Sequence, residues 1–148
     1  MKRIIFLFLL LGIFCFSNTG FKNVEWGMSQ EEVISKVKGT YRIGNGEVLY
    51  KNILFSNVKM ESVMFYFADG KLNSWVGMTE CTQNEFKNLI SNYESKYGKL
   101  EKEVTSKRES YIKNNSKSMV SYAVKIGEAT TQSKIAISIG YYDPKYYN

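Results

Sequence analysis

The sequence has no histidine, and its 148 residues include only two cysteines and one proline. Histidine is the commonest general base and metal ligand, so its absence excludes most catalytic triads and zinc sites. A thiol nucleophile is not expected, because no histidine is available to activate Cys15 or Cys81. The sequence therefore predicts a protein that is not an enzyme and binds no metal or cofactor. One enzyme class stays open, a hydrolase with two carboxylates brought together by the fold, since such a pair leaves no sequence signature.

A strong excess of one charge is also missing. The formal net charge is +6 at pH 7, and positive and negative residues alternate, as in Glu101-Lys102-Glu103. Nucleic-acid-binding proteins usually gather their positive charge on one face. We therefore expect a solvated surface of mixed charge and no nucleic-acid partner.

The first residues have the pattern of a secretory signal peptide. Lys2 and Arg3 precede an apolar run at 4–16, which is shorter than the ~18 residues needed to span a bilayer. Cys15-Phe16-Ser17 then offers small residues at the −3 and −1 positions of a cleavage site. We expect residues 1–17 to be removed and the protein to be exported, to the periplasm or the extracellular medium, with no stable membrane span.

Cys15 raises the alternative of a lipoprotein. Phe14 is bulky where bacterial lipoproteins carry a small residue before the cysteine, which disfavours lipidation. After cleavage only Cys81 remains, so no intrachain disulfide can form and a hydrophobic core must stabilise the fold. Residues 18–148 are long enough for a single domain.

Two helix starts share one pattern. Ser29 is a good N-cap, and Glu32 can close a capping box with it. Thr82 and Glu85 repeat this arrangement further along the chain. The repetition suggests two related halves, although capping boxes are common enough for chance similarity.

Hydrophobic periodicity predicts the order helix, strands, helix, strands. Helices are expected at 30–38 and 83–97, and strands at 40–43, 47–55, 61–68, 71–78, 100–112, 119–126 and 134–142. A single helix per set of strands cannot bury its apolar stripe alone, so both helices should pack on one face of an antiparallel sheet. The predicted fold class is a two-layer α+β domain, with 21–80 and 81–148 as candidate related halves.

The dipeptide Asp69-Gly70 predicts a two-residue hairpin turn, which fixes the pairing of the strands beside it. In that register Met64 faces Trp75 on one side of the hairpin, and Phe65 lies on the other side. If the helices cover the side of Phe65, then Met64, Tyr66 and Trp75 point outward. Large side chains gathered on an exposed sheet are typical anchors for a protein partner, so these three form the candidate binding site. The alternative is that another part of the chain covers them.

The segment Trp26-Gly27-Met28-Ser29-Gln30-Glu31-Glu32-Val33, followed by Gly39, resembles the helix start of small exported bacterial domains. These domains include the outer-membrane assembly lipoproteins of the SmpA/OmlA (BamE) type, the β-lactamase inhibitor proteins and exported proteins of unknown function. The resemblance implies a helix-on-sheet fold in the cell envelope and a role in binding proteins. This chain departs from the lipoproteins in having Thr40 where they usually have a proline, and from the inhibitors in lacking their disulfides. No binding residue carries over, because the shared motif is a structural helix start.

The sequence thus leaves several functions to distinguish. The first is an exported non-enzymatic domain that binds another envelope or secreted protein, as an assembly factor, adaptor or inhibitor. The second is a periplasmic carrier of a small apolar ligand held between helices and sheet, and the third is an enzyme of unknown type. An open aromatic patch would favour the first, a closed cavity of several hundred Å³ the second, and converging acidic residues the third.

Overall fold

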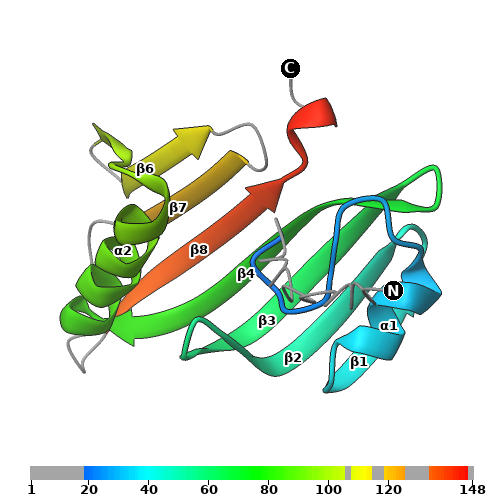
Figure 1. Cartoon of the computed structure of the whole chain (residues 1–148). Helices are drawn as coiled ribbons and strands as arrows, with labels where there is room; N and C mark the ends of the chain where they lie inside the picture. Colours follow the sequence, from blue (N-terminus) through cyan, green and yellow to red (C-terminus); the bar gives the residue numbers. More distant parts are fainter. Residues whose placement is uncertain (1–18, 106–107, 115–118, 126–133, 147–148) are drawn as a thin grey trace, which may run out of the picture.

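The computed structural model describes residues 19–105, 108–114, 119–125 and 134–146, which form one eight-stranded sheet and three helices (Figure 1). The strands are β1 Thr40–Gly44, β2 Glu47–Phe55, β3 Val58–Ala68, β4 Lys71–Thr82, β5 Glu101–Val104, β6 Arg108–Asn114, β7 Met119–Lys125 and β8 Lys134–Tyr142. The α-helices are α1 Gln30–Lys36 and α2 Gln83–Tyr97, and the 3-10 helix is η1 Pro144–Tyr146. The strand order is β1-β2-β3-β4-β8-β7-β6-β5, and every neighbouring pair is antiparallel.

The prediction of a two-layer α+β domain, with both helices on one face of the sheet, is wrong. Antiparallel strands dominate the described residues, and the helices do not form a layer over the sheet. They lie far apart, α1 beside β1 and α2 at the other end of the sheet (Figure 1). Helix α1 is also too short to build a layer, because it has seven residues and buries only Val33. The sequence pattern located the helices but not what covers the sheet between them.

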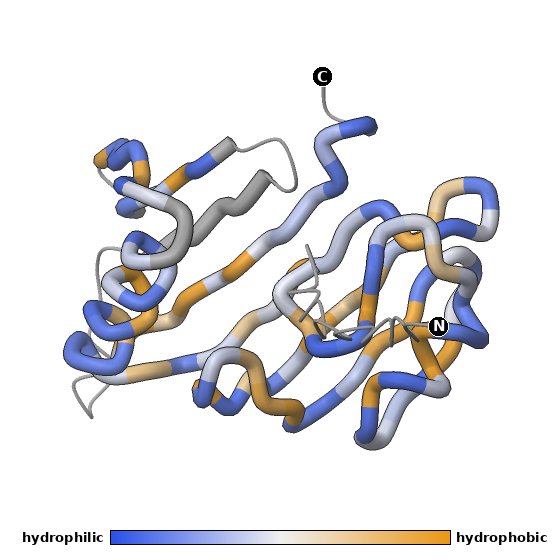
Figure 2. Tube along the Cα trace, viewed as in Figure 1, coloured by the Kyte–Doolittle hydropathy of each residue, from blue (hydrophilic) through white to orange (hydrophobic). Residues whose placement is uncertain are grey.

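The N-terminal segment 19–28 crosses the sheet between the two helices (Figure 1). The Phe21 ring lies 5.3, 5.2 and 4.8 Å, centroid to centroid, from the rings of Phe55, Phe65 and Trp75. Figure 2 shows hydrophobic and hydrophilic residues interspersed along the strands beneath this segment, whereas hydrophilic residues dominate the first turns of α2. An irregular segment therefore supplies part of the cover that the prediction assigned to helices.

Two contacts fix the start of this segment on the core. The indole N–H of Trp75 donates a 2.6 Å hydrogen bond to the backbone carbonyl of Thr19. Gly20 has a φ of +79°, and a Cβ at that position would lie 2.8 Å from a ring carbon of Phe55. Glycine is required there both by the left-handed backbone and by the close approach of the ring.

Both predicted helix caps are confirmed. The Ser29 hydroxyl accepts from the Glu32 backbone N–H at 3.2 Å, and the Glu32 carboxylate accepts from the Ser29 backbone N–H at 2.8 Å. Thr82 and Glu85 make the same pair of contacts at 3.2 and 2.7 Å. Each capped helix is followed by four antiparallel strands, and the two sets meet through β4 and β8. This common order is what related halves would give, and the repeat stays a prediction.

Two strand predictions need correction. The expected strand 100–112 is divided into β5 and β6, which pair with each other, with Glu101 opposite Ile112. Strand β3 starts at Val58, before the expected 61, because Ser56 and Asn57 adopt positive φ angles of 47° and 67° and close a two-residue turn after β2. That turn has no glycine, which is the usual signal for such a conformation.

Candidate functional site

The pairing of β3 with β4 decides which side chains share a face. The predicted hairpin turn forms, with positive φ at both of its residues. Phe67 lies opposite Leu72 as expected, but Tyr66 lies opposite Ser74, so Asn73 is an extra residue in β4. This β-bulge turns the residues of β4 beyond it to the face opposite from the predicted one.

The structure does not bring the three predicted binding residues together. Trp75 lies opposite Phe65, and both side chains are 0% exposed. Met64 lies opposite Val76 instead of Trp75, on the other face of the sheet. Tyr66 shares that face and is 38% exposed. The predicted pairing of Met64 with Trp75 is therefore wrong, and Trp75 belongs to the core.

The face of Met64 and Tyr66 is turned away from the N-terminal segment, which packs on the face of Phe65 and Trp75. We call it the open face. Leu49, Met64 and Val76 lie opposite one another across β2, β3 and β4. Its apolar and aromatic residues, which we call the open-face patch, are Leu49, Met64, Tyr66, Val76, Met78 and Tyr142. Met78 is the most exposed of them, at 57%.

Tyr142 extends the patch onto β8. A Cβ at Gly140, which lies opposite Val76, would be 2.7 Å from the Tyr142 hydroxyl oxygen and 2.8 Å from a ring carbon, so the Tyr142 side chain would have to shift. The Tyr142 ring therefore folds back over Gly140 beside Val76. A glycine at this position gives an aromatic ring room to lie along the sheet.

Small and charged residues surround the patch. Met78 lies between Ser62 of β3 and Ser138 of β8, and Glu47 lies opposite Tyr66. Lys51 is exposed and lies opposite Ser62. An apolar centre with a polar rim is the usual composition of a protein–protein interface.

The other face of the sheet is filled by aromatic rings. The Trp75 and Tyr141 rings are stacked, with centroids 4.9 Å apart and planes 9° apart. Phe55 lies edge-on to Trp75 at 4.8 Å, and Tyr93 of α2 lies 6.3 Å from Tyr141. A carrier would hold its ligand between helices and sheet, and these rings fill the part of that space between Phe55 and α2.

The ionisable side chains of the described residues bear on a metal site and on a reactive cysteine. No three Cys, Asp or Glu side chains gather there as a metal ion would require. Cys81 is buried, and burial, together with a smaller effect of the Glu85 carboxylate, raises the pKa of its thiol to about 11, so the thiol stays protonated at neutral pH. Lys102 forms a 3.3 Å ion pair with Glu109 at the exposed β5–β6 edge, where the hydrogen bonds that its ammonium group donates to Tyr111 and, less strongly, to Glu109 raise the pKa of the lysine.

Sequence reasoning missed Leu49, Val76, Met78 and Tyr142 as members of the open-face patch. The signal was a break in alternation: Leu72 and Trp75 are large apolar residues three positions apart in one strand. Two such residues can share a buried face only if the strand contains an extra residue between them. Reading that spacing as a bulge would have moved Val76 to the open face.

Neither the membrane-spanning potential of the helices nor comparison with known proteins identifies a function for this surface. Among the described residues, no helix has the length and apolar character needed to cross a membrane. Comparison of the chain with protein-family models, with curated proteins and with solved structures gives no match.

Proposed function

We propose that this protein is an exported, non-enzymatic domain that binds another envelope or secreted protein through the open-face patch. The observation that carries the proposal is the row of Leu49, Met64 and Val76, flanked by the exposed Tyr66 and Met78. An apolar surface of this kind, away from the segment that covers the core, is where a partner gains most from excluding water.

Removal of a signal peptide would not disturb the contacts that join the N-terminal segment to the core. Cleavage after Ser17 would leave Thr19 and its hydrogen bond to Trp75 in place, together with Gly20 and Phe21. Mass spectrometry of the protein from its native source should find a chain that begins at Asn18 or within a few residues of it. A native chain that keeps Met1 would refute export by this signal, and a diacylglyceryl group on Cys15 would identify a lipoprotein.

Partner binding can be tested by site-specific photo-crosslinking in the producing cells. With p-benzoylphenylalanine in place of Met78, we expect one protein to be crosslinked and then identified by mass spectrometry. The same group in place of Val104, which is 61% exposed on β5, is the matched control. Met64→Lys should abolish the crosslink at position 78, because a charge in the middle of the patch resists desolvation. Identical products at positions 78 and 104 would refute the open-face patch as the binding surface.

A further inference from the structure

A second surface lies on the covered side of the sheet, beside α1. It is an open groove of about 460 Å³ between the N-terminal segment, the end of α1 and β2. Phe21 and Lys22 line it from the segment, Lys36 from the last turn of α1, Lys38 from just after that helix, and Ile53 from β2. The volume is in the range of small-molecule binding sites.

The groove has charge of one sign. Three of its lining residues are lysines, and none is acidic. Within the part of the chain that the structure describes, no ion pair joins Lys22, Lys36 or Lys38 to a carboxylate. Three uncompensated positive charges around one depression attract an anion.

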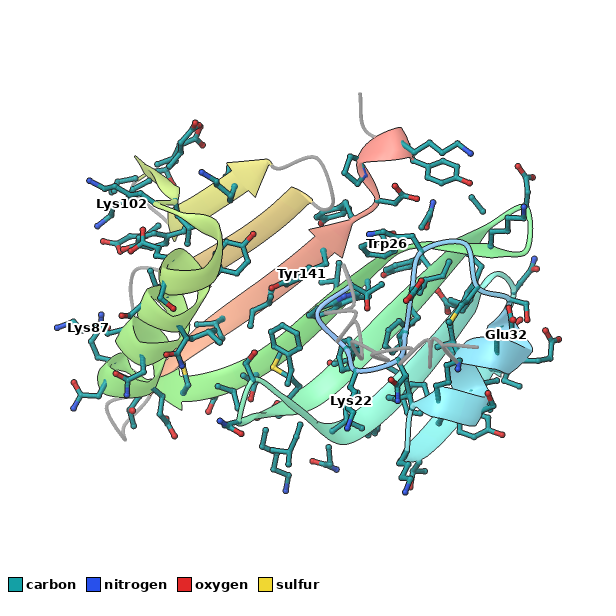
Figure 3. The ribbon with its side chains drawn as sticks, viewed as in Figure 1. Lys22, Trp26, Glu32, Lys87, Lys102 and Tyr141 are labelled. Carbon is teal, nitrogen blue, oxygen red and sulfur yellow. The ribbon has the colours of Figure 1, made fainter. Side chains whose placement is uncertain are left out.

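The end of the helix explains only part of this charge. Lys36 is in the last turn of α1, and Lys38 follows two residues later, where cations favour the negative end of the helix dipole. Lys22 comes from a different segment, which Figure 3 shows on the same side of the sheet as α1. The helix dipole does not account for the position of Lys22. The charge of Lys22 is therefore better evidence for an anion site than the charges of Lys36 and Lys38.

Apart from Asn52, the rest of the groove is apolar. Phe21 and Ile53 are buried members of the core, and Val37 packs partly buried against it. Gly39, just after α1, lets the backbone approach the Ile53 side chain closely. Its φ is +148°, and a Cβ there would lie 2.8 Å from that side chain. A ligand in this groove would therefore contact hydrocarbon below and ammonium groups at the rim.

We propose that the groove binds an anionic amphiphile, which is an apolar chain or ring with one carboxylate, sulfonate or phosphate group. The head group would contact the lysines, and the apolar part would lie on Phe21, Val37 and Ile53. This site is separate from the open-face patch, so it does not depend on the function proposed above. The amphiphile could be a free molecule or the head-group region of an anionic lipid, since both present the same chemistry.

Fluorescence titration of the mature chain tests the proposal with a pair of probes. Anilinonaphthalene sulfonate is anionic, and phenylnaphthylamine is a similar ring system without the charge. We expect the sulfonate to bind the protein more tightly than the neutral probe does. Lys22→Gln should lower the affinity for the sulfonate by about two- to five-fold, and the triple variant Lys22→Gln, Lys36→Gln, Lys38→Gln should lower it by about ten-fold or more. Binding of the neutral probe should stay within about two-fold in all variants.

The control is Lys87→Gln, because Lys87 lies on α2 at the far end of the sheet (Figure 3). It should leave both affinities unchanged, and equal urea midpoints will show that all variants fold alike. Displacement of the sulfonate by oleate identifies a free amphiphile, and displacement only by phosphatidylglycerol vesicles identifies a lipid head group. The proposal would be overturned if Lys87→Gln lowered the affinity for the sulfonate as much as Lys22→Gln does, or if the two probes bound equally well. It would also be overturned if hexaglutamate displaced the sulfonate while oleate and vesicles did not.

Discussion

Replacing Trp75 by alanine should destabilise the protein strongly, because this side chain joins the sheet to the N-terminal segment. It is 0% exposed, stacks on Tyr141 and meets the ring edges of Phe21 and Phe55. Its N–H also donates to the Thr19 carbonyl at 2.6 Å. The change would open a cavity and remove the hydrogen bond to that carbonyl at the same time.

The expected loss can be built from these contacts. A buried tryptophan removes about 150–250 Å² from water, which at roughly 25 cal/mol per Å² gives about 4–6 kcal/mol. Large-to-small substitutions of aromatic core residues usually cost about 3–5 kcal/mol. We therefore expect Trp75→Ala to lower the free energy of unfolding by at least about 3 kcal/mol. Trp75→Phe keeps one ring but loses the hydrogen bond to Thr19, so it should cost about 1–3 kcal/mol.

Urea denaturation of residues 18–148, followed by far-ultraviolet circular dichroism, measures these losses without depending on tryptophan fluorescence. Met78→Ala is the control, because Met78 is 57% exposed on the open face and should change stability by less than about 0.5 kcal/mol. A chain that starts at Gly20 lacks the Thr19 carbonyl and so cannot form this hydrogen bond. Combining that truncation with Trp75→Phe should therefore lower the free energy of unfolding by about 1 kcal/mol less than the sum of the two separate losses. If Trp75→Ala unfolds within about 1 kcal/mol of the wild type, the assignment of Trp75 to the core is wrong.

Four smaller predictions follow from other contacts. Ser29→Ala and Thr82→Ala should each cost about 1 kcal/mol in urea denaturation, and unchanged midpoints in both would contradict the caps. Tyr50→Phe should raise stability by about 1 kcal/mol, because the buried Tyr50 hydroxyl has no hydrogen-bond partner among the described residues, and a loss of stability would show that it has one. The free energy of unfolding should fall as pH rises from 9 to 11, because burial raises the pKa of the Cys81 thiol to about 11 and the thiol of the unfolded chain ionises first. Cys81→Ala should flatten that part of the pH profile, and an unchanged slope would count against the burial of Cys81. Deleting Asn73 should prevent cooperative unfolding or lower the midpoint more than Trp75→Ala does, whereas a native-like midpoint would contradict the bulge.

The features that could be predicted from the sequence are those set by a few neighbouring residues. A capping box needs only Ser29 with Glu32, or Thr82 with Glu85, and both formed. The Asp69-Gly70 turn is similarly local, and it has the predicted backbone conformation. Such features follow from hydrogen bonds and φ preferences within four residues, so distant packing rarely overrides them.

The features that could not be predicted depend on contacts distant in sequence. The cover over the middle of the sheet comes from 19–28, an irregular segment with no periodic pattern, and Phe21 finds Phe55, Phe65 and Trp75 only in the folded chain. The groove beside α1 likewise joins Lys22 to residues 36–38 and β2. No spacing rule relates such positions.

The bulge at Asn73 links the core to the open-face patch. In the predicted register Trp75 would lie on the open face and Val76 in the interior; the extra residue exchanges them, so the core gains the larger side chain. The backbone carbonyl of Asn73 also accepts a 2.8 Å hydrogen bond from the Asp143 N–H, directly after Tyr142. One inserted residue therefore buries Trp75, places Val76 in the patch and holds the end of β8 where Tyr142 folds over Gly140. Selection for a stable core and selection for the shape of the patch would act on the same position in β4.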